Sequence, residues 1–322
     1  MNQGVLDRVV CVYCASAVDV RAANIACSQC GQAYPKVGRI PVLLPQPHAH
    51  VELWRKQLAV LTEHGRQAES ALEAESKADG MLPQGRMRVR AMAQGVRSQV
   101  DEIIDIVGPA LGGPLAGSGG GLPRGVVEYS YYLHRDWGWA DADPNENRVA
   151  VESLHAIVSG QGLGRTAVLG AGGCRLAYDL HRLYKADETV VIDIDPYLFV
   201  IAEAVVRGAT VELTESSLNV FDLEHVSLRQ TLRAPDGPLD EQHFHFLFAN
   251  GLDPPFVEAT FDTVVTQWFI DRVPTDMEAF LVKMHRLLRP GGRWINQGPL
   301  LYPPETPVAR RYAREEIFDL VG

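Results

Sequence analysis

The sequence predicts an α/β fold, in which a parallel sheet carries helices on both faces and follows a helical region and a small metal-bound module. Short apolar segments alternate with helical ones from residue 125 onward, and four of the five cysteines form two close pairs near the N-terminus. A chain of 322 residues can hold one large domain and a small one. We divide it into residues 1–46, 47–124 and 125–322.

Residues 1–46 are predicted to bind zinc. Cys11-Val-Tyr-Cys14 and Cys27-Ser-Gln-Cys30 present four thiolates, a ligand set that suits a tetrahedral zinc ion. A module of about 45 residues buries little core, so the metal would supply folding energy. A redox role is disfavoured because the pair occurs twice in a segment with few strands. The predicted structural zinc ligands are Cys11, Cys14, Cys27 and Cys30.

The end of this module carries a resemblance to a known family. Tyr34-Pro35 and Gly38-Arg-Ile-Pro-Val-Leu43 follow the second cysteine pair. In this respect the module resembles the zinc ribbon of the small activator subunit of tRNA methyltransferases, where the same elements lead into a strand. The resemblance implies either a protein partner bound through the ribbon or internal support for the rest of the chain.

Residues 47–124 are expected to form two helices and a linker. Apolar side chains recur at helical spacing from Trp54 to Leu72 and again from Val89 to Val107. The segment Gly80 to Gly85 separates them. The glycine-rich run 112–123 is expected to be a flexible linker or a surface loop. From there on, strands are expected at 166–169, 189–192, 244–248, 261–266 and 294–296, and helices at 175–185, 197–207, 275–288 and 307–321.

The cofactor site is expected at the first of these strands. Gly170-Ala-Gly-Gly-Cys174 lies between a strand and a helix, where glycines let a ligand approach the backbone and a helix N-terminus offers free N–H groups. Asp193 ends the second strand and is placed to accept hydrogen bonds from ribose hydroxyls. We expect Asp195 to cap the following helix instead. These features alone do not distinguish between two candidate cofactors, NAD and S-adenosylmethionine (SAM).

Two further segments favour SAM. Leu247-Phe-Ala-Asn-Gly251 follows the third strand, and Leu288-Arg-Pro-Gly-Gly292 precedes the fifth. Their arrangement resembles the class I (Rossmann-like) SAM-dependent methyltransferases, in which a polar residue after the third strand contacts adenine. That residue is usually Asp, but the Asn250 amide can also pair with the adenine edge. We assign Asn250 and Gly251 to cofactor binding.

Four motifs indicate a branch of this class: Tyr131-Tyr-Leu-His-Arg-Asp-Trp-Gly138, Gly170-Ala-Gly-Gly-Cys-Arg-Leu176, Trp268-Phe-Ile-Asp271 and Trp294-Ile-Asn-Gln-Gly-Pro-Leu-Leu-Tyr302. Together they resemble the carnosine N-methyltransferase family, which methylates a ring nitrogen of an imidazole in a histidine-containing dipeptide. The resemblance covers roughly residues 125–302, and the last motif is the most specific.

The resemblance implies roles for individual residues. Arg135 would contact the SAM carboxylate. Tyr132, which stands where the family has a glutamine, is also assigned to cofactor binding. Asp271 would accept a hydrogen bond from the imidazole N–H of the acceptor, which leaves the lone pair of the opposite nitrogen free. The other expected SAM contacts are Gly170, Gly172 and Asp193. Tyr302 is named as a catalytic candidate that either lines the acceptor pocket or packs.

The chain departs from the family in several places. Pro303 stands where the family has a second imidazole-contacting histidine, and Cys174 replaces the last glycine of the turn. Asp271 has an alternative role as a helix cap before Asp276. The class normally carries two strands after the fifth, whereas here a helix is expected at 307–321. We therefore expect a sheet that lacks its last two strands, with an exposed edge and with weak stability or altered activity.

Composition and charge narrow the function. The net charge of −10 argues against a broad phosphate-binding surface and leaves only a local basic groove open for nucleic acid. No apolar run approaches the ~20 residues that span a bilayer, and no signal peptide is evident, so we expect a cytoplasmic protein. The predicted function is SAM-dependent N-methylation of an imidazole or amine nitrogen in a small molecule or peptide. An RNA or protein methyltransferase, and a non-catalytic partner-binding protein of the same fold, are the alternatives.

Overall fold

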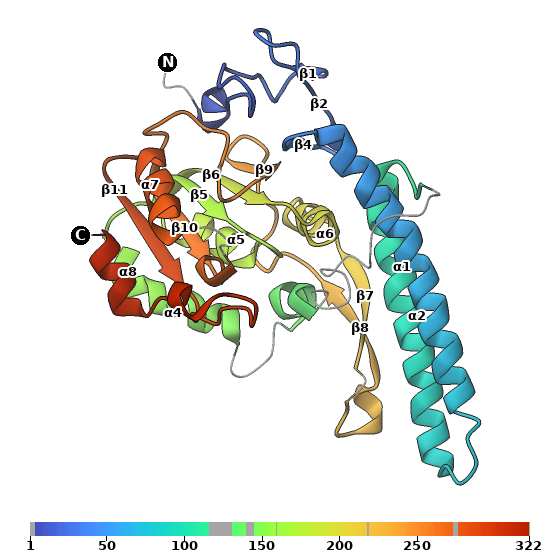
Figure 1. The fold of residues 1–322 in the computed structure, drawn as a ribbon. Helices are drawn as coiled ribbons and strands as arrows, with labels where there is room; N and C mark the ends of the chain where they lie inside the picture. The colour runs from blue at the N-terminus through green and yellow to red at the C-terminus, as the bar shows by residue number, and fades with distance from the viewer. Residues whose placement is uncertain are drawn as a thin grey trace.

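A seven-stranded, mostly parallel sheet forms the centre of the molecule (Figure 1). The computed structural model describes residues 4–115, 131–139, 145–158, 160–217, 219–272 and 276–321. The strand order is β11-β10-β5-β6-β9-β4-β3, and every pairing from β11 to β4 is parallel. The five strands expected from the sequence are β5 (Gly164–Leu169), β6 (Ala186–Asp193), β9 (Phe244–Ala249), β10 (Phe261–Gln267) and β11 (Leu288–Gln297).

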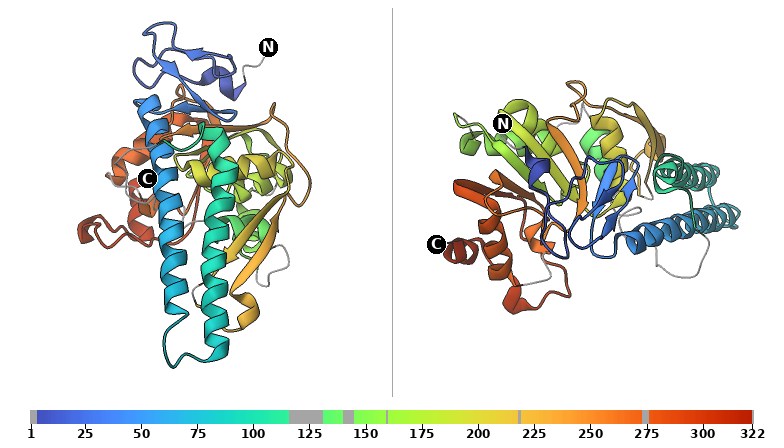
Figure 2. Two further views of the ribbon diagram at one scale, coloured as in Figure 1. Left: turned by 90° about the vertical axis from the view of Figure 1, so that its right-hand side faces the viewer. Right: turned by 90° about the horizontal axis from the view of Figure 1, so that it is seen from above.

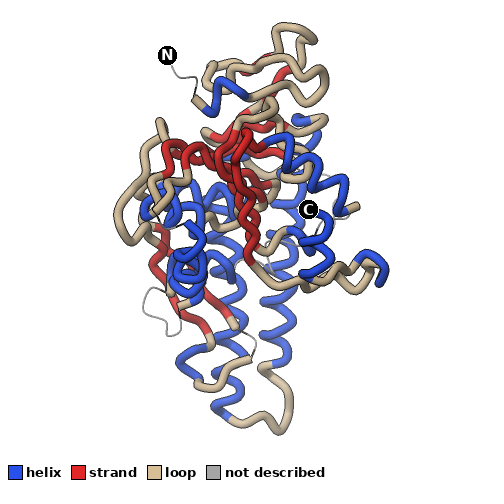
Figure 3. The backbone as a smooth tube through the Cα atoms, turned by 90° about the vertical axis from the view of Figure 1, so that its left-hand side faces the viewer, coloured by secondary structure: helices blue, strands red, loops and turns tan. Residues whose placement is uncertain are grey.

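Helices cover both faces of this sheet, as expected for an α/β fold (Figure 3). Alternate residues of β6 point to opposite faces: Val191 belongs to the core on one side and Val190 to the core on the other. Helices α4 (Glu146–Val158), α5 (Arg175–Leu183) and α6 (Pro196–Val206) pack on the first side, and α7 (Met277–Leu287) and α8 (Arg314–Val321) pack on the second. The predicted α/β class is confirmed.

One element near the C-terminal end differs from expectation. The helix expected at 307–321 is divided into a short 3₁₀ turn, Val308–Arg310, and α8. Between them, the Tyr312 carbonyl accepts a hydrogen bond from the Tyr302 hydroxyl (3.1 Å). No strand follows β11 in the described residues, and β11 is an edge of the sheet.

The N-terminal module is joined to the sheet. It contains a 3₁₀ turn (Val5–Arg8), β1 (Ile25–Ala26), β2 (Ala33–Tyr34), β3 (Lys36–Val37) and β4 (Ile40–Leu43). Strand β4 pairs in parallel with β9, with Val42 opposite Phe248. A second contact forms where the Val10 N–H donates to the Pro255 carbonyl (2.8 Å). The ribbon therefore shares a hydrogen-bond ladder with the sheet and covers the edge that β9 would otherwise expose.

A long helical arm extends beside the sheet. Helices α1 (Pro47–Glu75) and α2 (Pro83–Leu111) run antiparallel next to each other (Figure 2), and neither they nor any other described helix is long and apolar enough to cross a membrane. The arm packs on a two-stranded hairpin that the sequence analysis missed, β7 (Val211–Ser216) and β8 (Ser227–Leu232). Glu102 of α2 accepts hydrogen bonds from the Thr214 N–H (2.5 Å) and hydroxyl (3.0 Å), which fixes the hairpin to the arm. The glycine-rich run from 116 onward lies outside the described residues.

The two arm helices lie close together at Gly65, which gives a test of the packing. We expect Gly65→Ala to lower the free energy of unfolding by about 1–3 kcal/mol. Its new methyl group would lie 2.9 Å from Cγ1 and 3.1 Å from Cβ of Val100, and a β-branched side chain cannot rotate both branches away. Gly85→Ala in α2 is the control, because its methyl would meet only the flexible Met81 side chain. Urea denaturation of both variants is the measurement, and a Gly65→Ala protein as stable as wild type would contradict the close approach.

Candidate active site

A cavity of about 560 Å³ opens at the carboxyl ends of β5, β6 and β10. Cavities of this size at the carboxyl edge of a parallel sheet commonly hold small ligands. Six of the residues that the sequence analysis assigned to cofactor binding or catalysis line it together. They are Tyr132, Arg135, Gly170, Gly172, Asp193 and Asp271.

The glycine turn after β5 is held by the carboxylate of Asp193. Gly170 and Gly172 have φ values of 65° and 51°, a region that glycine adopts without strain. Asp193 Oδ2 accepts a hydrogen bond from the Gly172 N–H (2.7 Å), and Oδ1 accepts from the N–H groups of Ile194 (2.7 Å) and Asp195 (2.8 Å). Oδ2, which accepts a single hydrogen bond, keeps further lone-pair capacity. Asp193 therefore shapes the turn and still faces the space that a nucleoside would occupy.

Asp195 has the capping role that the sequence predicts. Its side chain accepts hydrogen bonds from the N–H groups of Tyr197 (2.8 Å) and Leu198 (3.2 Å) at the start of α6. Burial and the neighbouring Asp193 charge raise the pKa of Asp195 to about 6. The two carboxylates of this short segment thus have separate tasks, one at the glycine turn and one at the helix.

Arg135 lies between two aromatic rings on the opposite wall. Its guanidinium carbon is 4.6 Å from the centre of the Tyr132 ring and 4.1 Å from that of Trp268, distances typical of cation–π contacts. Its terminal nitrogen forms an ion pair with Asp136 (2.7 Å), and the pair is buried. Burial raises the pKa of Asp136 to about 6, although the Arg135 charge opposes this shift. The guanidinium is therefore held by two aromatic rings and one carboxylate.

The short π-helix that carries Arg135, His134–Gly138, is tied to the glycine turn. The Trp137 indole N–H donates to the Gly173 carbonyl (2.7 Å). Arg175, at the start of α5, donates to the Asp136 carbonyl (2.7 Å). A β-carbon added to Gly173 would collide with the Asp136 carboxylate. These contacts join the two walls of the cavity into one unit.

Asp271 lies in a 3₁₀ turn, Ile270–Arg272, just after β10. It is buried (5% exposed), its Oδ2 accepts a hydrogen bond from the Leu301 N–H (3.1 Å), and its Oδ1 has no hydrogen-bond partner among the described residues. Burial raises the pKa of Asp271. The alternative role as a helix cap does not apply to α7, because Asp276 caps that helix by accepting from the Glu278 N–H (2.9 Å). One oxygen of Asp271 is therefore held by the Leu301 N–H, and the other accepts no hydrogen bond from the residues that the structure describes.

Three predicted residues do not line this cavity. The Tyr302 hydroxyl donates to the Tyr312 carbonyl, which gives this side chain a packing role in the structure. Asn250 is exposed and accepts from the Leu252 N–H (3.0 Å), and Gly251 packs close to the Phe269 ring. Their assignment to catalysis and cofactor binding stays a prediction.

The cavity also contains residues that the sequence analysis did not assign. They include Asp136, Glu146, Gly173, Gln267, Trp268 and Arg272. Trp268 has a φ of 48°, which is rare for a bulky residue and typical of strained functional positions. Asp136 and Trp268 stand inside motifs that the sequence analysis singled out, so position within the motif was the available signal. Arg272 directly follows one of those motifs.

The four paired cysteines come together in the ribbon. Their sulfur atoms all lie within 4.8 Å of one another, with 3.6 Å between Cys11 and Cys30 and 3.5 Å between Cys14 and Cys27. Four thiolates at Zn–S bond lengths of about 2.3 Å in a tetrahedron lie roughly 3.8 Å apart. The donor set and its spacing therefore fit a zinc ion.

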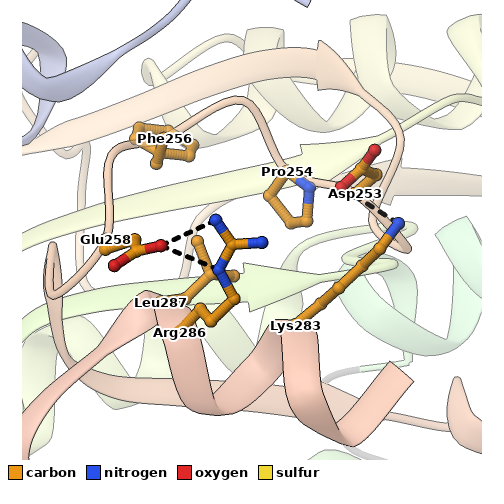
Figure 4. Close-up of a pocket in the computed structure, with 7 residues that line it drawn as sticks. All are labelled: Asp253, Pro254, Phe256, Glu258, Lys283, Arg286 and Leu287. Carbon is orange, nitrogen blue, oxygen red and sulfur yellow. Dashed lines mark hydrogen bonds and ion pairs between the residues drawn. The ribbon is translucent and has the colours of Figure 1, made fainter. Parts of the chain in front are cut away.

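A second, smaller cavity of about 100 Å³ lies between α7 and the segment that follows β9 (Figure 4). Its charged side chains are paired with each other: Lys283 with Asp253 (3.0 Å) and Arg286 with Glu258 (2.6 Å). Each of its charged side chains is thus already paired, unlike Asp271, which has one oxygen without a hydrogen-bond partner among the described residues. The cavity that Asp271, Asp193 and Arg135 line together is therefore the candidate active site.

Comparison with known proteins agrees with this geometry. Residues 183–320 match the family described as Carnosine N-methyltransferase. A Carnosine N-methyltransferase from Dictyostelium discoideum is 47% identical over 45 residues, which cover 14% of this chain and 10% of that protein. The family match includes Asp193 and Asp271, whereas Arg135 and Gly170 precede it.

Solved structures with a partial likeness to the chain include several methyltransferases. A complex of the Haloferax volcanii Trm112 methyltransferase activator with a methyltransferase matches at 16% identity and a TM-score of 0.33, covering 47% of this chain and 51% of that one. Haemonchus contortus phosphoethanolamine N-methyltransferase 2 matches at 15% identity and a TM-score of 0.35, covering 55% of this chain and 35% of that one. The chain thus spans a tenth of its curated relative in the carnosine N-methyltransferase family and about half of the first of these structures.

The hydrogen bonds of Asp193 predict a difference between two neighbouring variants. We expect Asp193→Asn to lower the free energy of unfolding by about 1–3 kcal/mol, because an amide nitrogen cannot accept a hydrogen bond and one N–H donor would lose its partner. Asp195→Asn should change stability little, since Asn caps helices nearly as well as Asp. Urea denaturation monitored by circular dichroism measures both. An equal loss of stability in the two variants would contradict the role of the Asp193 hydrogen bonds in holding the glycine turn.

Proposed function

We propose that this protein is a SAM-dependent N-methyltransferase whose acceptor is an imidazole or amine nitrogen of a small molecule or peptide. The observation that carries the proposal is the buried Asp271, which lines the same cavity as Asp193 and Arg135. One of its oxygens is held by the Leu301 N–H, and the other accepts no hydrogen bond from the described residues. The carnosine N-methyltransferase match over residues 183–320 supports the same reaction class.

The lining of the cavity fits SAM. When bound, SAM supplies an electrophilic methyl group on a cationic sulfur. Asp193 would hold the ribose hydroxyls, and Arg135 would bind the carboxylate of the methionine part. Asp136, beside Arg135, would face the cationic ammonium group. Five carboxylates line the cavity (Asp136, Glu146, Asp193, Asp195 and Asp271), which favours a ligand that carries positive charge.

Asp271 would orient the acceptor. Its free Oδ1 accepts the N–H of a neutral imidazole, which places the lone pair on the opposite ring nitrogen. Alignment of that lone pair is the main requirement of the reaction, because displacement at the methyl carbon releases a neutral thioether that needs no acid. Since burial raises the pKa of Asp271, this carboxylate is protonated at a higher pH than an exposed Asp. Methylation should therefore decline as the pH falls through that range.

The cysteine site would hold a structural zinc ion in the ribbon. We propose that the ribbon acts as internal support for the methyltransferase part, since β4 pairs with β9 and β9 pairs with β6, the strand that ends in Asp193. A protein partner bound through the same ribbon is the second candidate. It has less support, because the ribbon strand that pairs in parallel is already bound to β9.

The role of Asp271 predicts the outcome of two substitutions. We expect Asp271→Asn to lower kcat for a histidine dipeptide by about 10²–10⁴-fold, because the amide cannot serve equally as a charged acceptor, and to leave the Kd for SAM within a few-fold. Tyr302→Phe tests the other catalytic candidate and should keep most of the activity if this residue packs. Transfer of labelled methyl groups to histidine dipeptides, free histidine, other imidazoles and bulk RNA measures both. Unchanged kcat in Asp271→Asn, or methylation of RNA alone, would contradict the proposal.

The zinc site predicts a change in metal content and stability. Purified protein should hold roughly one zinc ion per chain, and Cys27→Ser should lose most of it together with thermal stability. Cys174→Ser is the matched control, since Cys174 is buried in the glycine turn and is not part of the cysteine cluster. Elemental analysis and thermal unfolding are the measurements. Wild-type zinc content in Cys27→Ser would rule out this ligand set.

A further inference from the structure

The cavity contains two cationic side chains, Arg135 and Arg272, and they differ in their surroundings. Arg135 is buried, forms an ion pair with Asp136 (2.7 Å) and approaches Glu146 (3.8 Å). Arg272 is exposed and forms no ion pair with a carboxylate in the part of the chain that the structure describes. Arg272 is therefore the cation that remains available to an anionic group of a ligand.

The position of Arg272 links it to the acceptor. It follows Asp271 directly in the 3₁₀ turn, and its charge lowers the pKa of Asp271 against the effect of burial. The segment that follows β11 lies on the same side, because Pro299 and Leu301 also line the cavity and the Leu301 N–H donates to Asp271. Arg272 thus lies beside Asp271, whereas the Arg135 guanidinium is enclosed by the Tyr132 and Trp268 rings and paired with Asp136.

We propose that Arg272 is a specificity-determining residue that binds a carboxylate of the methyl acceptor. This inference rests on the proposed function and extends it. The acceptor is then an imidazole compound with a carboxylate a few bonds from the ring, such as histidine or a histidine dipeptide with a free C-terminus. The ring N–H donates to Asp271 Oδ1, and the carboxylate lies on the neighbouring guanidinium.

The geometry of the guanidinium group favours a carboxylate as its ligand. A guanidinium offers a planar pair of N–H donors that matches the two oxygens of a carboxylate. An α-carboxylate is ionised at any pH above about 4, so it keeps its charge where the imidazole is neutral and nucleophilic. A cavity lined by five carboxylates repels an anionic group elsewhere on its wall. Discrimination comes from both effects, attraction at Arg272 and repulsion around it.

The test compares acceptors that differ only in this charge. The protein is saturated with S-adenosylhomocysteine, and binding of carnosine and of its carboxamide is measured by calorimetry for wild type, Arg272→Ala and Arg272→Lys. Arg310→Ala is the matched control, because Arg310 is an exposed arginine that does not line the cavity. Methyl transfer to both acceptors is measured in parallel.

We expect wild type to bind carnosine about 10-fold more tightly than its carboxamide, the size expected of a charge-assisted hydrogen bond. Arg272→Ala should remove this preference, Arg272→Lys should restore part of it, and Arg310→Ala should keep it. The inference is overturned if the preference is absent in wild type or survives in Arg272→Ala. It is also overturned if Arg272→Ala instead weakens the binding of S-adenosylhomocysteine, because Arg272 would then be a cofactor-binding residue. Methylation of both acceptors without a preference overturns the inference alone, whereas the absence of both binding and methylation overturns the proposed function as well.

Discussion

The crevice at the carboxyl end of β5 is the constraint on which the site depends. The chain winds from β5 through β6 to β9 in one direction and then returns to β10 on the other side of β5. Connections therefore leave in opposite directions at this point, and a cavity opens between them. The carboxylate of Asp193 holds the backbone at this crevice by accepting the N–H of Gly172 in the glycine turn and the N–H groups of Ile194 and Asp195 after β6.

The ribbon covers the sheet beside β9, where the connection to β10 contains no helix. The connection from β9 to β10, residues 250–260, contains no helix, and ribbon residues around Val9 and Val10 pair with it at Phe256 and Pro255. Strand β4 then covers the free edge of β9. A small module with little core of its own thus gains a large partner, and the sheet gains a cover for one face and one edge. This mutual dependence explains why metal binding and the stability of the cofactor strands are coupled in our proposal.

The sequence predicted the elements that depend on local pattern. Buried strands such as β5 and β6 are continuous apolar runs, and the two arm helices repeat apolar residues at helical spacing. The pairing of β4 with β9 joins residues about 200 positions apart, and no local pattern encodes it. The β7–β8 hairpin was missed because its stability depends on Glu102 of the arm rather than on a strong alternation of its own. Among the site residues, motif positions such as Asp271 were predicted, whereas Arg272 needed the three-dimensional lining of the cavity.

The replacement of a histidine by Pro303 changes what the acceptor site requires. An imidazole held at one ring nitrogen can still rotate about that hydrogen bond, and rotation moves the opposite lone pair away from the methyl group. Proline offers no side-chain donor or acceptor, so this chain cannot supply the second contact at that position. A second anchor must then lie elsewhere on the acceptor, away from the ring. Arg272, next to Asp271 and without an ion pair among the described residues, is where the structure offers one, so the acceptor's orientation would depend on its carboxylate.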